Sequence, residues 1–279
     1  MKRHPLVTAR ATRHHYPART AFAELRGELA RPASPTRRTV VAVISAVLLG
    51  GCGGGSNNTS TASAQPVSVP LQAAFANEVD NGDTASFSVS GTIDNVSVTG
   101  SGTLTDSPPV VATFNGATVL ETRQTITDTV VENGVPITVT ETKAIFSDPG
   151  TSAEVGQIND DGSVDVITQI DPIPASAPVG SSGVLGEGIE YSNSSEQTTV
   201  GTVEETYAVG SGAGSAGGSS TATCDVVDVV KEVKDNNKNQ IRKSEKKTCV
   251  DDRGNSRFVS GEEHERDNGR DDDLNETGH

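Results

Sequence analysis

Residues 125–142 of this 279-residue chain read TITDTVVENGVPITVTET, and this stretch decides the fold class. Asn133-Gly134 at its centre predicts a two-residue hairpin turn, because type I′ turns need positive φ at both central positions. If Glu132 pairs with Val135, threonines face threonines along one side of an antiparallel hairpin. Threonine and valine alternating with period two are typical of half-buried strands, so the stretch predicts two long antiparallel strands.

The other side of this hairpin mixes apolar and acidic residues. The same register pairs Val130 with Ile137 near the turn, and it places Asp128 and Glu141 further out on that side, with Lys143 beyond them. A buried face does not accept unpaired carboxylates, because removing a charge from water is costly. Two interpretations therefore stay open: the far end of the hairpin is solvated, or the sheet surrounds a polar-lined cavity.

The period-two alternation recurs before this hairpin. Small polar and apolar residues alternate through 84–104 on both sides of Asp94-Asn95, which fits a two-residue turn. Asn115-Gly116 is a further type I′ signal. The pattern predicts a succession of antiparallel hairpins.

Strand-like segments continue after the hairpin, at 188–192 and 200–209. Turn residues and short alternating segments at this spacing indicate an all-β protein. We therefore predict an all-β domain at 67–260, an antiparallel meander of about ten to twelve strands. Its shape is a twisted sheet, a half-barrel or a sandwich.

Residues 159–162, Asn-Asp-Asp-Gly, resemble the middle of a calcium-binding loop. The EF-hand pattern would place Gln157 at the first ligand position and Thr168 at the position of the bidentate glutamate, so the pattern fails. Asp161-Gly162 is better interpreted as a hairpin turn. We therefore predict no metal ligands here.

Two cysteines frame the hairpin predicted at 221–250. If Asn236-Asn237 is a two-residue turn, Cys224 falls directly opposite Cys249 in a non-hydrogen-bonded pair, where side chains lie close. We therefore predict a disulfide between Cys224 and Cys249. A helix across the same stretch is the alternative, but the valines and the asparagine-rich break favour strands.

The chain is strongly acidic once its first 51 residues are set aside. These contain nine of the 22 Lys/Arg and two of the 37 Asp/Glu, so the remaining 228 residues keep 13 bases and 35 acids. Such a chain repels nucleic acid, and we expect no nucleic-acid partner. The segment 261–279 is charged and nearly free of apolar residues, so we predict a disordered tail.

Residues for common catalytic and metal sites are missing. Beyond residue 51 the only histidines are His264 and His279, both in the predicted tail. We therefore predict no catalytic residues, no cofactor-binding residues and no metal site, and expect that the protein is not an enzyme. A carboxylate-based hydrolase is an alternative, with Asp128 and Glu141 as its candidates if they converge in one pocket.

Residues 36–52 read TRRTVVAVISAVLLGGC. The apolar run after the basic pair is too short for a transmembrane helix and fits the core of a signal peptide. Its end, 49–52, resembles the lipobox of bacterial lipoproteins. The resemblance implies that residues 1–51 are a signal segment removed before Cys52, that Cys52 is lipidated, and that several acyl chains anchor the protein stably. An ordinary secretory signal, with Cys52 in a later disulfide, is the alternative.

The residues around this signal qualify where the protein goes. The segment 1–35 is longer than a usual basic region, so either that region is extended or the translation start lies further along. Residues 52–66 are rich in Gly and Ser and predict a flexible tether. Gly53 stands where an aspartate would favour the inner membrane, so the resemblance implies the outer membrane, on its periplasmic or surface face.

We therefore expect a lipid-anchored protein of the bacterial envelope with a non-catalytic binding or structural role. The membrane, through the lipid on Cys52, is its first partner. An apolar ligand in a groove of a curved sheet, or another envelope protein, is the second. A surface-exposed adhesin or interaction module is the alternative, besides the hydrolase.

Overall fold

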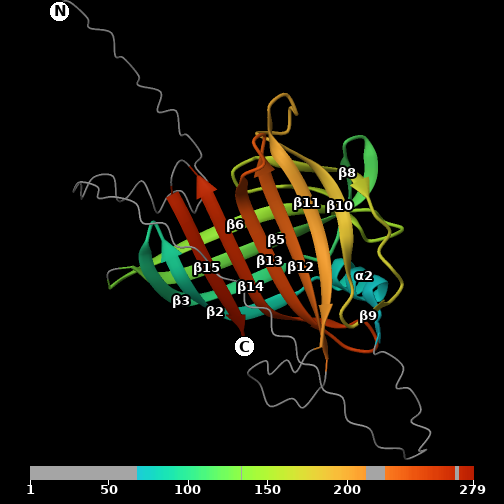
Figure 1. The fold of residues 1–279 in the computed structure, drawn as a ribbon, viewed down its shortest axis with the longest axis horizontal. Helices are drawn as coiled ribbons and strands as arrows, with labels where there is room; N and C mark the ends of the chain where they lie inside the picture. Colours follow the sequence, from blue (N-terminus) through green and yellow to red (C-terminus); the bar gives the residue numbers. More distant parts are fainter. Residues whose placement is uncertain (1–67, 133, 212–223, 268–269) are drawn as a thin grey trace, which may run out of the picture.

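The computed structural model describes residues 68–132, 134–211, 224–267 and 270–279. One antiparallel sheet closes on itself as a barrel of twelve strands (Figure 1). The predicted all-β antiparallel meander is thus confirmed, and its shape is a closed barrel. The barrel strands are β2 (Thr84–Ile93), β3 (Val96–Asp106), β5 (Ala117–Glu132), β6 (Val135–Ser147), β7 (Glu154–Ile158), β8 (Val164–Ile170), β10 (Ser182–Tyr191), β11 (Thr199–Gly210), β12 (Asp225–Asp235), β13 (Gln240–Val250), β14 (Ser256–Asp267) and β15 (Arg270–Gly278).

Short turns join the first strands as the sequence predicts. Asp94 and Asn95 have φ of 49° and 64°, and Asn115 and Gly116 have φ of 48° and 78°. Positive φ at both positions matches the right-handed twist of the flanking strands. These local signals therefore set the pairing of β2 with β3 and of β4 (Val110–Phe114) with β5.

The register of the hairpin formed by β5 and β6 is confirmed at every predicted pair. The hydroxyls of Thr129 and Thr138 lie 2.9 Å apart, and those of Thr127 and Thr140 lie 3.2 Å apart on an exposed face. Asn133 of the turn lies outside the described residues. The threonine ladder is on the outside of the barrel, so the acids on the other side of these strands face the lumen.

The predicted disordered tail is wrong, because residues 261–279 contain the end of β14 and all of β15. β15 pairs with β14 on one side and with β2 on the other, and so closes the barrel. Its side chains alternate: Leu274, Glu276 and Gly278 are buried, whereas the residues between them are exposed. Only one of these inward positions is occupied by a large apolar residue, so the segment resembles a solvated tail in sequence.

The disulfide between Cys224 and Cys249 is confirmed, with a Cα–Cα distance of 5.4 Å. The predicted register is wrong by two residues, because Val226, not Cys224, lies opposite Cys249. The turn is longer than two residues, since the Asp235 carboxylate accepts hydrogen bonds from the backbone of Asn237 and Asn239. The cysteines are therefore diagonal neighbours rather than direct partners.

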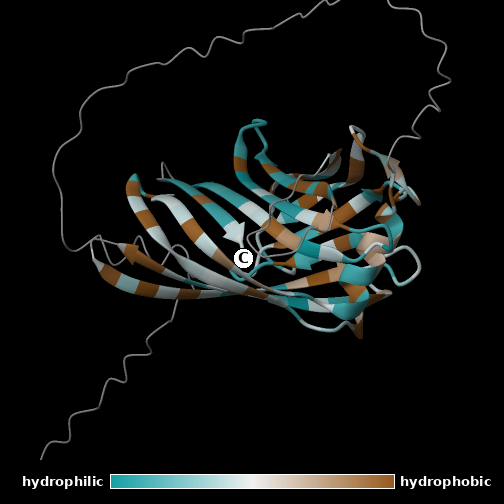
Figure 2. Cartoon of the chain, turned by 90° about the horizontal axis from the view of Figure 1, so that it is seen from below, coloured by the Kyte–Doolittle hydropathy of each residue, from teal (hydrophilic) through white to brown (hydrophobic). Residues whose placement is uncertain are grey.

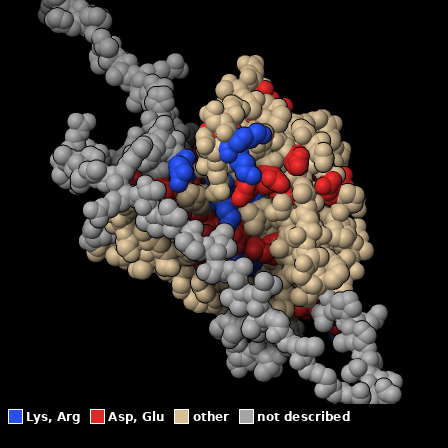
Figure 3. Space-filling view, viewed as in Figure 1, with Lys and Arg blue, Asp and Glu red and all other residues tan. Residues whose placement is uncertain are grey.

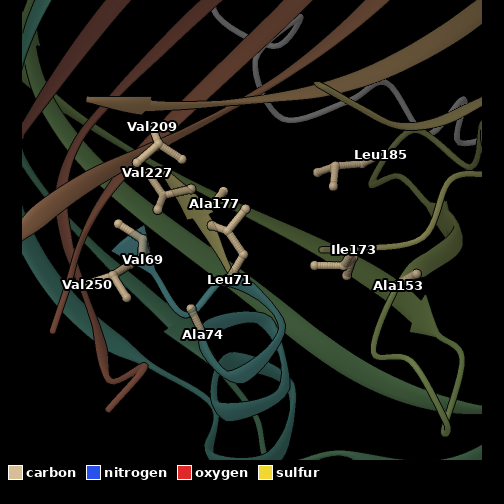
Figure 4. Packing of buried hydrophobic residues seen from close by; sticks show 10 residues of the cluster. All are labelled: Val69, Leu71, Ala74, Ala153, Ile173, Ala177, Leu185, Val209, Val227 and Val250. Atoms are coloured by element: carbon tan, nitrogen blue, oxygen red, sulfur yellow. The ribbon is translucent and has the colours of Figure 1, made fainter. Parts of the chain in front are cut away.

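A helix at one end of the barrel was not predicted. α2 (Leu71–Asn81) begins after Pro70 and ends before Gly82, whose φ is 66°. It packs with β1 (Ser68–Val69) and β9 (Ala177–Pro178), which form a small separate sheet. Leu71, fully buried, lies at the centre of this apolar cluster (Figure 4). In the described part of the chain, no helix has the length and apolar character of a transmembrane segment.

Apolar and polar residues alternate along the barrel strands (Figure 2). Inside, Phe87 is fully buried against Phe258, and Gly102 leaves room for it, because a Cβ on Gly102 would lie 2.4 Å from the Phe87 ring. Outside, β4 covers part of the wall, where Phe114 stacks on Phe146 with ring centroids 4.4 Å apart. The remaining lumen is free to hold polar groups.

Candidate functional site

The lumen encloses a cavity of about 220 Å³ between α2 and the inner walls of the strands. Part of its lining is apolar, and seven acidic and three basic residues also line it. Ligand pockets typically measure about 300–1,000 Å³. This cavity is smaller than that range, so a ligand that fits it is a small molecule. The apolar lining includes Phe75, Leu104, Ile126, Leu185, Val227 and Val229.

Lys231 is the centre of the charges in the lumen. It projects from β12, and its Nζ lies 2.5 Å from Glu154 Oε1 on β7 and 3.3 Å from Asp165 Oδ2 on β8. It also donates a hydrogen bond of 2.9 Å to Gln157 Oε1. β7 and β12 are not neighbours in the sheet, so these contacts cross the lumen and tie opposite walls together.

Burial and charge act against each other on these groups. Burial alone would lower the pKa of Lys231, but the negative charges of Glu154 and Asp165 more than offset it, so its pKa is raised. Burial raises the pKa of Glu154, although Lys231 opposes this rise. Lys231 therefore stays charged at every physiological pH, and its neighbours depend on that charge.

A second ion pair joins the barrel wall to α2. Lys246 Nζ on β13 lies 2.5 Å from Glu78 Oε1 of the helix. Gln124 donates a hydrogen bond of 3.0 Å to Asp106, a buried acid whose pKa is raised by desolvation. The Lys246–Glu78 pair ties α2 to the barrel wall, whereas the Gln124–Asp106 hydrogen bond joins β5 to β3 at the same side of the cavity.

A third pair lies further along the lumen. Arg242 Nη2 is 2.9 Å from Glu190 Oε1 on β10 and 3.9 Å from Asp165 Oδ1. Asp165 is completely buried, and neither of its oxygens has a hydrogen bond among the described residues. It is stabilised instead by the charges of Lys231 and Arg242.

Glu205 on β11 differs from the other acids of the cavity. Its residue is 9% exposed, and its carboxyl has no hydrogen bond or ion pair to any described residue. It lines the cavity, and it pairs with Lys231 in the register of β11 and β12, so the two residues are neighbours on adjacent strands. Burial, and then the charge of Glu154, raise its pKa to about 8, so it is mainly protonated at neutral pH.

A second, smaller cavity of about 100 Å³ continues the lumen away from α2. It shares Lys143, Gln157, Lys231, Ser244 and Glu263 with the first cavity. Its other lining residues are mostly charged, and Lys143 lies 4.0 Å from Glu263 there. A molecule could therefore reach the inner cavity through a charged outer space.

Comparison with known protein families, with curated proteins and with solved structures finds no match to this chain. The candidate site therefore depends on the geometry of these residues alone.

The residues singled out from the sequence are in three different places. Cys52 lies outside the described residues, and Cys224 and Cys249 lie on the outer side of the barrel, away from the cavity. Asp128 is buried at the inner wall but lines neither cavity, whereas Glu141 lines only the smaller one. The two hydrolase candidates, Asp128 and Glu141, therefore do not line the same cavity.

The sequence left open whether the side of the hairpin that carries Asp128 and Glu141 is solvated or lines a cavity. In the structure this side faces inward. Gln124 and Lys143 on this side of β5 and β6 line the larger cavity and Glu141 lines the smaller one, so the far end of the hairpin is part of a polar-lined cavity, although Asp128 lines neither. Among the described residues, no group of three or more His, Cys, Asp or Glu side chains is arranged to hold a metal ion.

Sequence reasoning missed the acids and bases of the cavity, although a signal for them exists. On β11 the inward positions are Val203, Glu205, Tyr207 and Val209, and on β12 they are Val227, Val229, Lys231 and Val233. In each strand one charged residue interrupts an apolar alternation. The apolar residues on either side face the interior, so the charged residue between them faces the interior too. Such a residue indicates a buried group that is functional or paired.

Other charges lie on the outside of β12 and β13. Lys234 contacts Glu232 at 2.8 Å, and Lys247 and Lys243 pair with Glu245. Figure 3 shows Lys and Arg intermingled with Asp and Glu on this face. These pairs are partly exposed, and such pairs contribute about 0–1 kcal/mol each, so we assign them no role in the site.

Proposed function

We propose that this protein is a lipid-anchored, non-catalytic binding protein of the bacterial envelope that carries a small molecule inside its barrel. The observation that supports this most directly is the cavity between α2 and the strands. It combines an apolar lining with a few buried polar groups, which is the composition of ligand pockets in general. The sequence of residues 36–52 supports the anchor.

The binding role is tested by filling the cavity. Val229 lines the cavity, whereas its neighbour Val230 on β12 faces outward, so Val229→Trp and Val230→Trp form a matched pair. Native mass spectrometry of the gently extracted full chain is expected to show extra mass that leaves on activation. Val229→Trp is expected to lose this mass and Val230→Trp to keep it.

Three results would contradict a non-catalytic binding role in the lumen. A wild-type chain without any bound molecule, when extracted from its own cells, would argue for a structural role. A bound molecule that both tryptophan variants retain equally would lie outside the lumen. A bound molecule that leaves with a changed chemical structure after incubation would favour the hydrolase alternative.

The anchor is tested separately from the cavity. Cys52→Ala is expected to move the protein from the membrane fraction to the soluble fraction, because the acyl chains are lost. Ser56→Ala, in the tether, is the control and is expected to remain with the membranes. Retention of Cys52→Ala in the membrane fraction would defeat the proposal of lipid anchoring.

A further inference from the structure

Glu205 lines the cavity without a hydrogen bond or ion pair to any described residue, although the charge of its cross-strand neighbour Lys231 acts on it. A buried polar group without a partner is costly, and in native structures such a group usually has a ligand, an ion or water beside it. Its carboxyl lines the cavity rather than the outer surface. The cavity therefore has a defined polar anchor point beside its apolar lining.

The bases around the cavity are already paired. Lys231 contacts Glu154 and Asp165, and Lys246 contacts Glu78. The third cavity base, Lys143, has Glu263 at 4.0 Å. An anionic ligand would have to displace one of these carboxylates, so the cavity is poorly suited to a fatty acid or another carboxylate.

The excess of acids over bases gives the cavity a negative field. Of its seven acidic residues, Glu205 is mainly protonated at neutral pH and Glu245 pairs with Lys243 and Lys247 on the outer face. The other five line it against three basic residues, and fields of one sign in a low-dielectric cleft concentrate ligands of the opposite sign. A cation could therefore enter favourably, and Glu205 would be its partner. The field and the vacant carboxyl are independent observations, and both indicate a positively charged ligand.

The apolar lining restricts the rest of the ligand. Val229, Leu185 and Ile173 line the same cavity as Glu205. From this arrangement we propose that the cavity binds a small primary amine with an apolar tail, its ammonium group against Glu205 and its tail against these aliphatic side chains. This inference rests on the proposed function, because it names the ligand class for the same cavity.

Binding of such an amine releases a proton. Burial and the charges of Glu154, Glu78 and Asp165 raise the pKa of Glu205 to about 8, against the opposing charge of Lys231, so its carboxyl is mainly protonated at pH 7 in the free protein. An adjacent ammonium favours the carboxylate, so the proton of the carboxyl passes to solvent as the ion pair forms. The amine, whose pKa resembles the roughly 10.4 of a lysine side chain, is charged before and after binding.

The test uses three probes of equal length on the full chain: pentylamine, pentanol and pentanoate. Titration calorimetry at pH 7 is expected to give a Kd for pentylamine at least tenfold below those of the other two. In buffers of different ionisation enthalpy, proton release of up to one proton per amine bound is expected. Both results are read on the wild-type chain, so they do not depend on the folding of a variant.

A matched pair of variants locates the contact. Glu205→Gln is expected to raise the Kd of pentylamine at least tenfold and to abolish proton release. Glu204→Gln, one residue away and facing outward, is expected to leave both unchanged. Equal affinity of wild type and Glu205→Gln for pentylamine, or no preference for the amine over the alcohol, would overturn the inference.

The Val229→Trp variant separates this failure from a failure of the proposed function. If Val229→Trp weakens the binding of pentanol but pentylamine has no advantage in wild type, the lumen binds ligands and only the amine inference is wrong. If Val229→Trp affects the binding of neither probe, binding in the lumen is itself wrong.

Discussion

The variant Lys231→Met tests whether charges across the lumen hold the barrel together. Methionine keeps the length of the side chain but removes the ammonium that contacts Glu154 and Asp165. Both acids then stay buried without this cation. Removal of one partner from a buried ion pair typically costs about 3–5 kcal/mol, so we expect a loss of that size in the free energy of unfolding at pH 7.

The pH dependence of this loss follows from proton uptake. Without Lys231, Glu154 stays buried by binding a proton, and the ordinary pKa of its carboxyl is 4.5. At about 1.4 kcal/mol per pH unit, neutralisation costs about 3.4 kcal/mol at pH 7 and about 0.7 kcal/mol at pH 5. Burial already raises the pKa of Glu154 in wild type, so wild type also gains some stability as the pH falls. The deficit of the variant relative to wild type is therefore expected to shrink by at most about 2.7 kcal/mol between these pH values.

Urea unfolding followed by circular dichroism at pH 7 and pH 5 provides the measurement. Lys234→Met is the matched control, because Lys234 lies on the same strand with its side chain 33% exposed and pairs with acids on the outer face. It is expected to lose at most about 1 kcal/mol. Equal losses in the two variants, or a deficit of Lys231→Met that grows at pH 5, would refute the reasoning.

Three other substitutions probe separate parts of the barrel. Cys224→Ser opens a loop with a sequence separation of 25 and is expected to lower the free energy of unfolding by about 3 kcal/mol. An unchanged urea midpoint would contradict a stabilising disulfide. Leu71→Ala, at a fully buried position of α2, is expected to lower the free energy of unfolding by about 2–5 kcal/mol, whereas its control Val111→Ala, at a position 75% exposed, is expected to change it by less than about 0.5 kcal/mol. Equal melting temperatures of the two variants would contradict the packing of α2. Glu205→Gln removes a carboxyl whose pKa is raised from 4.5 to about 8 on folding, so the stability of wild type falls by up to about 1.4 kcal/mol per pH unit as the pH rises between these values. The variant is expected to have a flatter profile of stability against pH in this range, and parallel profiles would contradict burial of that carboxyl.

The parts of the fold that depend on local chemistry could be predicted from the sequence. The register of β5 and β6 follows from Gly134 and the threonine spacing, and the β2–β3 turn follows from Asp94-Asn95. The disulfide partners were also predictable, but their register was not. It depends on hydrogen bonds of the Asp235 side chain that lengthen the turn.

The closure of the barrel and the cavity could not be predicted by the same reasoning. β15 carries Glu276 and Gly278 at buried positions, so its composition resembles a solvated tail although the lumen accepts polar side chains. α2 was overlooked, yet the spacing of Leu71, Ala74 and Phe75 is that of a helix face. The pairing of Lys231 with Glu154 joins residues 77 positions apart, which no local pattern indicates.

Amide hydrogen exchange in the last strand tests the closed barrel most directly. The lumen and its buried charges exist only if β15 pairs with both β14 and β2. The structure predicts that amides of residues 273–277 exchange as slowly as those of residues 88–92 of β2, because both segments pair on two sides. Exchange of residues 273–277 at the rate of an unstructured peptide, with β2 still protected, would show an open sheet and contradict the account of the lumen.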